Sequence, residues 1–147
     1  MKKLFTITLG LVLMTLVFTS CSLITGASTE SNEGLYKAAI ERYFNSVIQA
    51  DTDTFLDSLD PLGPAYPDAA TIEQLRADAN ENGLPGEAVV KNITVIEESA
   101  TRATVKVTLF LSVDFDRNGE FDEETYYPTF ELTFKNGVWR IFDGKVE

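Results

Sequence analysis

Beyond a short apolar run at the N-terminus, hydrophobic positions follow two different periods along the chain. Between residues 35 and 83 they recur every three or four positions, which is the spacing of a helix with one buried face. After residue 86 hydrophobic and polar positions alternate, which is the spacing of a β-strand with one buried face. The pattern therefore predicts an α+β domain in which helices precede an antiparallel sheet.

Three helices are expected in the first of these regions. The clearest covers residues 35–51, where hydrophobic residues form one side and charged residues the other. A shorter helix over 51–61 is expected to stop at Pro61, because proline cannot continue a helix. The third covers residues 68–83 and has Gly83 where a glycine commonly ends a helix.

Four strands are expected after the helices. The first covers residues 89–98, the second covers 101–115, and residues 126–146 contain the last two. Phe110 interrupts the alternation of the second strand. The residues expected on the buried face of this strand are Ala103, Val105, Val107, Leu109, Leu111, Val113 and Phe115.

The last two strands are joined by Asn136-Gly137, a pair typical of a two-residue hairpin turn. Such a turn places Phe134 opposite Trp139 and Leu132 opposite Ile141, all on one face. A shift of the pairing by one residue would expose all four side chains, so the turn and the hydrophobic pattern predict the same register.

The composition limits the functions that are available. The chain has 147 residues, which suits one domain, and a formal charge of −11. This acidic balance argues against nucleic acid as a partner, since a protein that binds it must neutralise phosphates. The sequence has no histidine, which removes the commonest general base and the commonest transition-metal ligand.

The N-terminus resembles that of a bacterial lipoprotein. Two lysines precede an apolar run over residues 4–18, which is too short for a membrane span, and the run leads into Phe18-Thr19-Ser20-Cys21. This tetrapeptide resembles a lipobox, and Cys21 is the only cysteine of the chain. The resemblance implies a signal peptide over residues 1–20 and a lipid on Cys21. We therefore expect an extracytoplasmic protein, anchored in the bacterial cell membrane or outer membrane through that lipid.

The remaining chain divides into a tether and a domain. Residues 21–34 contain the expected lipidated cysteine and a stretch of small, polar residues that is typical of a flexible tether. Residues 35–147 are expected to form the single domain. Without residues 1–20 the chain has 10 basic and 23 acidic residues, a formal charge of −13. Anionic lipid headgroups repel such a surface, so the lipid is expected to hold the protein at the membrane without help from the domain.

The order of the expected elements resembles the nuclear transport factor 2-like superfamily. The shared features are a long first helix, a short helix over "FLDSL" and a closing hairpin over "FELTFKNGVWRIFD". The resemblance implies a cone in which three N-terminal helices pack on a curved, four-stranded antiparallel meander. A cystatin-like fold, with one helix across a similar meander, is the alternative.

The same resemblance implies an apolar pocket between the first helix and the concave sheet. Aromatic side chains are expected to line it, although seven such rings in a small domain more often form a packed core. The residues in question are Tyr36, Tyr43, Phe44, Phe110, Tyr126, Phe130 and Trp139.

Two functions fit these features. The first is a non-enzymatic binding or interaction module, whose partner is a protein, cell-wall material or a small apolar ligand. The second is a pocket enzyme of the isomerase or dehydratase type that works through carboxylates and a tyrosine, without histidine. The candidates for the second function are Asp51, Asp53, Asp57 and Tyr43, and their spacing does not distinguish them from helix-capping and surface residues.

The stretch "DFDRNGEFDEE", residues 114–124, resembles the first part of a calcium-binding EF-hand loop. Oxygen-bearing side chains stand at alternate positions and a glycine stands at the sixth. Thr125 at the twelfth position departs from that pattern, because it lacks the carboxylate that closes the calcium site. The candidate calcium ligands are Asp114, Asp116, Asn118, Glu120, Asp122 and Glu124. An acidic hairpin connection without metal is the alternative.

Overall fold

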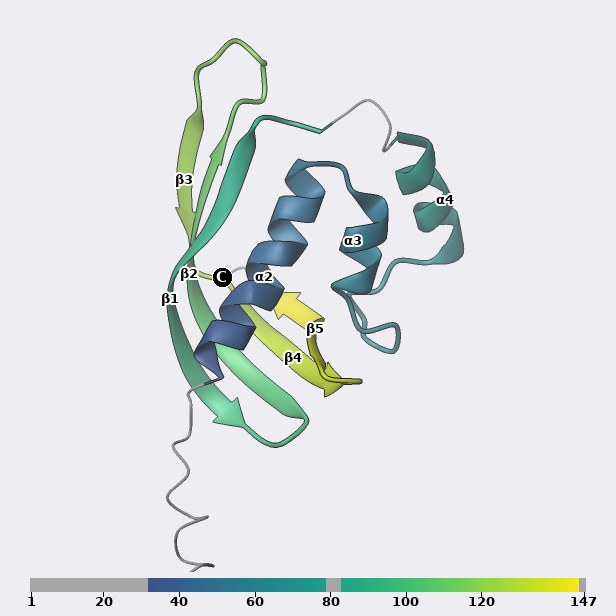
Figure 1. Ribbon diagram of the computed structural model, residues 1–147, viewed down its shortest axis with the longest axis vertical. Coiled ribbons are helices and arrows are strands. Elements are labelled where there is room, and N and C mark those ends of the chain that lie inside the picture. Colours follow the sequence, from purple (N-terminus) through teal and green to yellow (C-terminus); the bar gives the residue numbers. More distant parts are fainter. Residues whose placement is uncertain (1–31, 79–82, 146–147) are drawn as a thin grey trace, which may run out of the picture. The chain divides into compact units, whose positions relative to one another are not determined.

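Three helices precede five strands in the computed structural model, which describes residues 32–78 and 83–145 (Figure 1). The helices are α2 (Glu33–Ile48), α3 (Thr52–Asp57) and α4 (Ala69–Asp78). The strands are β1 (Gly86–Glu98), β2 (Arg102–Val113), β3 (Asp122–Tyr126), β4 (Thr129–Lys135) and β5 (Val138–Lys145). The α+β class and the order of helices before an antiparallel sheet are confirmed. No helix in the described ranges is long and apolar enough to cross a membrane.

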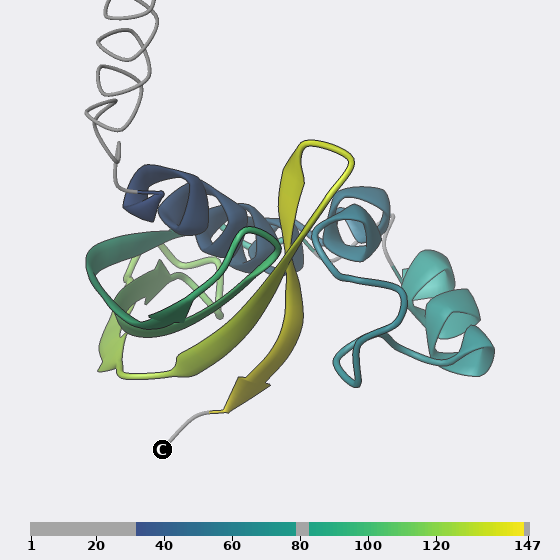
Figure 2. The ribbon, with the colours of Figure 1, turned by 90° about the horizontal axis from the view of Figure 1, so that it is seen from below.

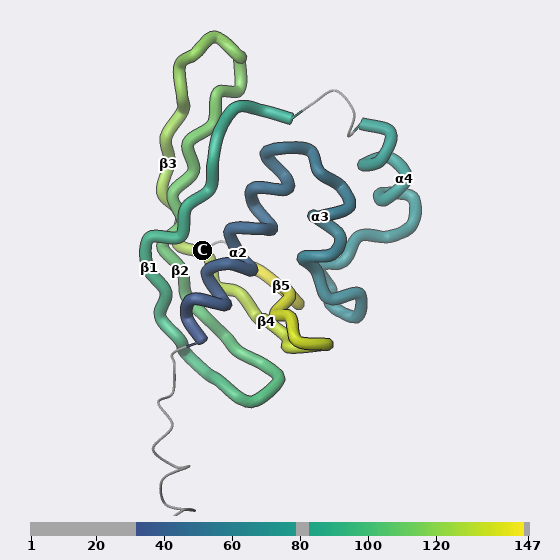
Figure 3. The backbone as a smooth tube through the Cα atoms, in the orientation of Figure 1, coloured from purple at the N-terminus to yellow at the C-terminus, as the bar shows by residue number. Residues whose placement is uncertain are grey.

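Strand β2 organises the sheet, because three other strands pair with it. Along one edge it pairs with β1, and along the other it pairs first with β4 and then with β3. Strand β5 follows β4 in the order β1-β2-β4-β5. Figure 3 shows β3 in the upper half of the molecule and β4 in the lower half, with β2 running past both.

The expectation of four strands was wrong in one place. A fifth strand, β3, covers Asp122–Tyr126, most of which was expected to belong to the acidic loop, and Tyr127-Pro128 separates it from β4. Proline has no N–H group to donate to a neighbouring strand, and only the carbonyl of Pro128 takes part in the sheet, accepting from the Val107 N–H at 2.9 Å.

The closing hairpin has the expected register. Phe134 lies opposite Trp139, and Leu132 lies opposite Ile141. The turn at Asn136-Gly137 has positive φ angles of 53° and 80°, as a type I′ turn requires.

The buried face of β2 follows the predicted alternation up to Val113. Phe115 was wrongly placed on this face: its side chain is 62% exposed, because β2 ends two residues earlier and the chain turns into the loop before β3. Leu111 is only half-buried, and the other predicted residues of the face are buried.

Helix α2 lies over the curved sheet (Figure 2). Two of its polar side chains bond to the outer edge of β1. The Asn45 side chain accepts from the Ala88 N–H at 2.9 Å and donates to the Ala88 carbonyl at 3.1 Å. The Glu41 carboxylate accepts from the Val90 N–H at 2.8 Å. These bonds satisfy backbone groups that an edge strand would otherwise leave unpaired.

The opposite edge of the sheet is covered by the segment that follows α3. Leu59 forms a parallel bridge to Ile141 of β5. The Asp60 N–H donates to the Ile141 carbonyl at 2.8 Å, and the Ile141 N–H donates to the Ser58 carbonyl at 2.9 Å. Gly63 then passes so close to β5 that a Cβ atom there would lie 2.2 Å from the Phe142 carbonyl oxygen.

The carboxylate of Asp60 fastens this segment to β4. Its side chain is 1% exposed and accepts hydrogen bonds from the Thr133 hydroxyl at 2.6 Å, the Lys135 ammonium at 2.8 Å and the Leu62 N–H at 3.0 Å. Burial alone would raise the pKa of Asp60, but these three donors and the charge of Lys135 outweigh it and lower the pKa to about 2.

Replacing Asp60 should therefore weaken the fold at neutral pH and have less effect in acid. Because the folded pKa lies below the usual value of 3.8, the stabilisation is fully present above about pH 4 and is lost as the pH falls towards 2. We expect Asp60→Asn to lower the free energy of unfolding by about 2 kcal/mol at pH 7. Urea unfolding at a series of pH values measures the difference.

The matched control is Asp53→Asn, which removes a carboxylate that is 87% exposed. We expect it to change the free energy of unfolding by less than about 0.5 kcal/mol. An Asp60→Asn deficit that is the same at pH 2.5 and pH 7 would contradict the assigned role of the ionised carboxylate.

Candidate functional site

An apolar groove of about 360 Å³ lies between α2, α3 and α4. Its size falls in the range of pockets that hold small molecules. Hydrophobic side chains from all three helices line it, and carboxylates lie at its margin. The lining residues are Tyr43, Ser46, Val47, Ala50, Asp51, Thr52, Phe55, Leu75 and Asp78.

The turn between α2 and α3 shapes one end of the groove. Ala50 has a φ of 53°, a left-handed conformation that side chains other than glycine and asparagine seldom adopt. Asp51 then caps α3 by accepting from the Thr54 N–H at 3.0 Å. The Thr52 hydroxyl donates to the Leu75 carbonyl at 3.1 Å and so holds α4 beside α3.

Of the four candidate residues for proton chemistry, Tyr43 and Asp51 line the groove. Tyr43 is the more deeply set of the two in hydrophobic surroundings. The ring packs against Phe44 at 4.9 Å and Phe55 at 5.4 Å between centroids. Burial raises the pKa of the Tyr43 hydroxyl, and no group within the described ranges hydrogen-bonds it. The groove thus offers a neutral hydroxyl in apolar surroundings.

Two of the candidate carboxylates, Asp51 and Asp57, have lowered pKa values. Hydrogen bonds from Arg42 and Arg140 lower the pKa of Asp57, and the Thr54 N–H and hydroxyl lower the pKa of Asp51. Asp53 lies in an exposed pair with Arg76 at 3.6 Å. A carboxylic acid that donates a proton at neutral pH needs a raised pKa, so Asp51 and Asp57 lack that feature of such an acid.

The interior expected to form a pocket is occupied by packed rings. Tyr36 meets Trp139 edge to face at 4.9 Å, and Phe44 meets Phe130 at 6.0 Å. Tyr36, Phe130 and Trp139 are all buried, and the Tyr36 hydroxyl donates to Glu98 at 2.5 Å.

Two other rings of the expected pocket lie apart from this cluster. Tyr126 packs at the edge of the core, where its hydroxyl donates to Glu124. Phe110 was wrongly assigned to the pocket: it lies on the outer face of the sheet, under the Lys91 ammonium at 4.9 Å, because its neighbours Leu109 and Leu111 take the inner positions of β2.

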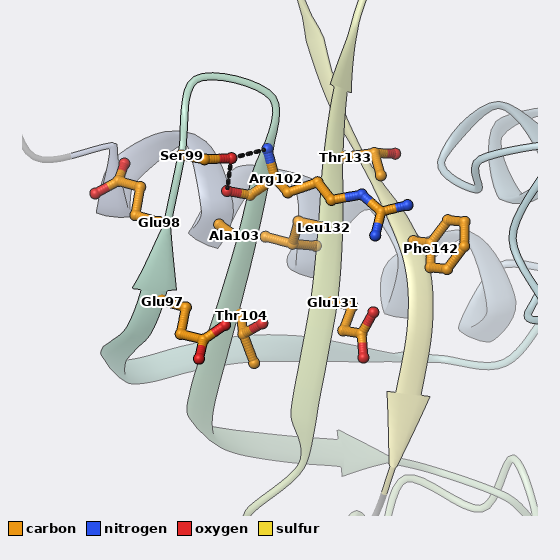
Figure 4. A pocket seen from close by; sticks show the side chains of 10 residues that line it. All are labelled: Glu97, Glu98, Ser99, Arg102, Ala103, Thr104, Glu131, Leu132, Thr133 and Phe142. Carbon is orange, nitrogen blue, oxygen red and sulfur yellow. Dashed lines mark hydrogen bonds between the residues drawn. The ribbon is translucent and has the colours of Figure 1, made fainter.

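A second, polar groove crosses the outer face of β1, β2, β4 and β5 (Figure 4). The Arg102 side chain reaches across β4, and its guanidinium lies 5.0 Å from the centre of the Phe142 ring. Glu97, Thr104 and Glu131 come from three neighbouring strands of the same face. Sequence reasoning missed both grooves, because they depend on contacts between elements far apart in the chain.

The acidic loop between β2 and β3 is organised by its own first residue. The buried carboxylate of Asp114 accepts from the Asn118 N–H at 3.1 Å and the Gly119 N–H at 2.8 Å. Asn118 in turn accepts from the Glu120 N–H at 2.8 Å. Arg117 and Gly119 have positive φ angles of 54° and 87°.

The later residues of the expected calcium site belong to a different element. Asp122 and Glu124 lie in β3, where Glu124 pairs across to Leu111 and accepts from Tyr126. Asp116 and Glu120 are exposed in the loop. Among the described residues, no three histidine, cysteine, aspartate or glutamate side chains gather into a group that could hold a metal ion. Cys21 lies outside the described ranges.

The sequence matches no protein-family model and no curated protein. Solved structures do resemble it. A Nostoc punctiforme protein of unknown function with a cystatin-like fold has a TM-score of 0.61 at 12% identity, covering 81% of this chain and 92% of its own. The association domain of Caenorhabditis elegans CaMKII has a TM-score of 0.61 at 16% identity, covering 80% of this chain and 96% of its own.

A ketosteroid isomerase-like protein from Erwinia carotovora has a TM-score of 0.50 at 18% identity, covering 78% of this chain and 94% of its own. At these identities the likeness concerns the fold alone. The chain thus has the cystatin-like, nuclear transport factor 2-like α+β fold, as the order of its elements predicted.

Proposed function

We propose that the protein is a lipid-anchored, extracytoplasmic binding module that holds a small apolar ligand in the groove between α2, α3 and α4. The observation that carries this proposal is the groove itself, an apolar concavity that Tyr43 helps to line. A few polar groups in an apolar pocket are what orients a ligand in most small-molecule sites.

The lining residues define the chemistry of the ligand. Val47, Phe55 and Leu75 offer hydrophobic contact, and Tyr43 offers one hydrogen-bond donor. Asp51, whose pKa is lowered, also lines the groove, and the described lining residues include no arginine or lysine. The ligand is therefore an uncharged or cationic molecule with an apolar body and a hydrogen-bond acceptor.

The groove can be tested with N-phenyl-1-naphthylamine, a neutral probe that fluoresces in apolar surroundings. We expect saturable binding to the wild-type domain and a dissociation constant about tenfold higher for Val47→Asp, since a carboxylate in the groove must be desolvated. The side chain of Val47 is 52% exposed, so the fold tolerates the change.

Ile96→Asp is the control, because Ile96 is 55% exposed but lies in β1 away from the groove. Equal affinity of Val47→Asp and the wild type, or equal losses in both variants, would show that the probe binds elsewhere.

The anchor part of the proposal rests on Phe18-Thr19-Ser20-Cys21 and the apolar run before it. We expect mature protein extracted from membranes to begin at Cys21 and to carry lipid, and Cys21→Ala to remain an unlipidated precursor. Intact-mass measurement decides the matter: retention of residues 1–20, or an unmodified Cys21, would refute the anchor.

Calcium is a second candidate ligand, favoured by the backbone of the acidic loop. Its sixth residue, Gly119, makes the sharp turn that a calcium loop needs. The carboxylate of Asp114, the first residue, accepts hydrogen bonds from the N–H groups of the fifth and sixth residues. We propose that calcium binds there with the modest affinity of extracellular modules, with a Kd of roughly 10⁻⁴–10⁻³ M.

Calcium at ten times Kd should then stabilise the fold by about 1.4 kcal/mol. Thermal unfolding with 5–10 mM calcium (roughly ten times a mid-range Kd) against chelator measures this effect. Asp116→Ala should abolish this stabilisation, because it removes one of the candidate calcium ligands. The change should not disturb the loop itself, since Asp116 is exposed and bonds to no backbone group within the described ranges. Glu97→Ala, on the outer face of the sheet, should leave the stabilisation unchanged. A melting temperature that calcium does not raise in the wild type identifies the loop as an acidic turn.

A further inference from the structure

Within the described domain, β1, β3 and β5 each have one side with no strand neighbour. Asn45 and Glu41 bond to Ala88 and Val90 on that side of β1, and Leu59 forms a bridge to Ile141 on that side of β5. Strand β3 pairs with β2 on one side, and no other strand in the described ranges pairs with it. Figure 1 shows β3 at the margin of the sheet, on the side away from the three helices.

The pairing pattern shows which backbone groups face outward from β3. Both backbone groups of Ala88 bond to Asn45, so they point away from β2, and the groups of its partner Leu111 point towards β3. The Val107 N–H, four residues earlier on β2, points the same way, to Pro128. Glu124, opposite Leu111, therefore bonds inward to β2.

Alternation along the strand then turns the N–H and C=O groups of Glu123 and Thr125 outward. Outside the strand ladders, none of the backbone hydrogen bonds within the described ranges uses the N–H of either residue. Such a row of unpaired groups is a template for an added strand.

The charge of β3 determines what can pair there. Asp122, Glu123 and Glu124 are consecutive and exposed, in a chain with a formal charge of −11. If β3 of a second molecule paired with this strand, carboxylates would face each other. Directly facing residues have Cβ atoms about 4.5–5.5 Å apart, and like charges at that separation repel. A strand bearing lysine or arginine would instead place opposite charges face to face.

We propose that β3 is a docking strand for a basic, extended segment of another protein, which adds to the sheet through the backbone groups of Glu123 and Thr125. Main-chain hydrogen bonds supply the pairing, and the three carboxylates select the charge of the partner. This surface lies on the sheet, whereas the ligand groove lies among the helices, so either proposal can fail without the other.

The test uses a seven-residue peptide of alternating valine and lysine, titrated into the mature domain at low and physiological salt. We expect this peptide to bind. The same peptide with every backbone nitrogen methylated should bind about tenfold more weakly, because it keeps its charge but has no backbone N–H to donate to β3. A peptide of alternating valine and glutamate should not bind.

The protein variants are Thr125→Pro, which removes one outward N–H, and Thr125→Val, which keeps it. Proline is tolerated on edge strands, and the single tryptophan, Trp139, reports whether the variant is folded. We expect about tenfold weaker binding for Thr125→Pro and no change for Thr125→Val.

Amide hydrogen exchange in the wild type gives a readout that needs no variant. The peptide should slow exchange at Glu123 and Thr125 and leave Glu124, already bonded to β2, unchanged. Equal binding of the methylated peptide, or unchanged exchange at both outward amides, overturns the proposal. A homodimer in sedimentation experiments that Thr125→Pro dissolves also overturns it, since a second copy would then occupy the edge.

Discussion

The bonds between Asn45 and the backbone of Ala88 hold the first helix and the first strand together, and much of the domain depends on them. They join residues 43 positions apart and fix both the height and the rotation of α2 over the sheet. With α2 so placed, Tyr36 meets Trp139 from above and Tyr43 faces α3. One amide side chain thus closes an edge of the sheet and positions one wall of the groove.

Local chemistry explains which parts of this fold the sequence could predict. The Asn136-Gly137 turn determines its own register, because both residues must adopt positive φ, and the alternation of β2 identifies its buried face. Strand β3 was not predicted, because its residues, Asp122–Tyr126, are mostly acidic and lack the hydrophobic alternation that marks the other strands. The groove could not be predicted, because it depends on the left-handed turn at Ala50 and on a bond from Thr52 to α4.

The groove and the outer edge of β3 lie on different parts of the fold. The cone interior, which the family resemblance suggested for a ligand, is filled by rings that stabilise α2 on the sheet. Concave space is found instead where three helices meet, and outward-facing backbone groups are found along β3. The solved structures that resemble this chain do so at 12–18% identity, so the likeness concerns the fold and does not extend to these surfaces.

Gly63 constrains how this sequence can diverge. A Cβ atom there would sit 2.2 Å from the Phe142 carbonyl oxygen, a contact with backbone that no side-chain rotation relieves. Any other residue would lift the turn from β5, and with it the cover that Leu59 and Asp60 place over that strand. Relatives that close their sheet in this way must retain a glycine at the corresponding position, so this residue can serve as an evolutionary signature of the arrangement even where the rest of the sequence has changed beyond recognition.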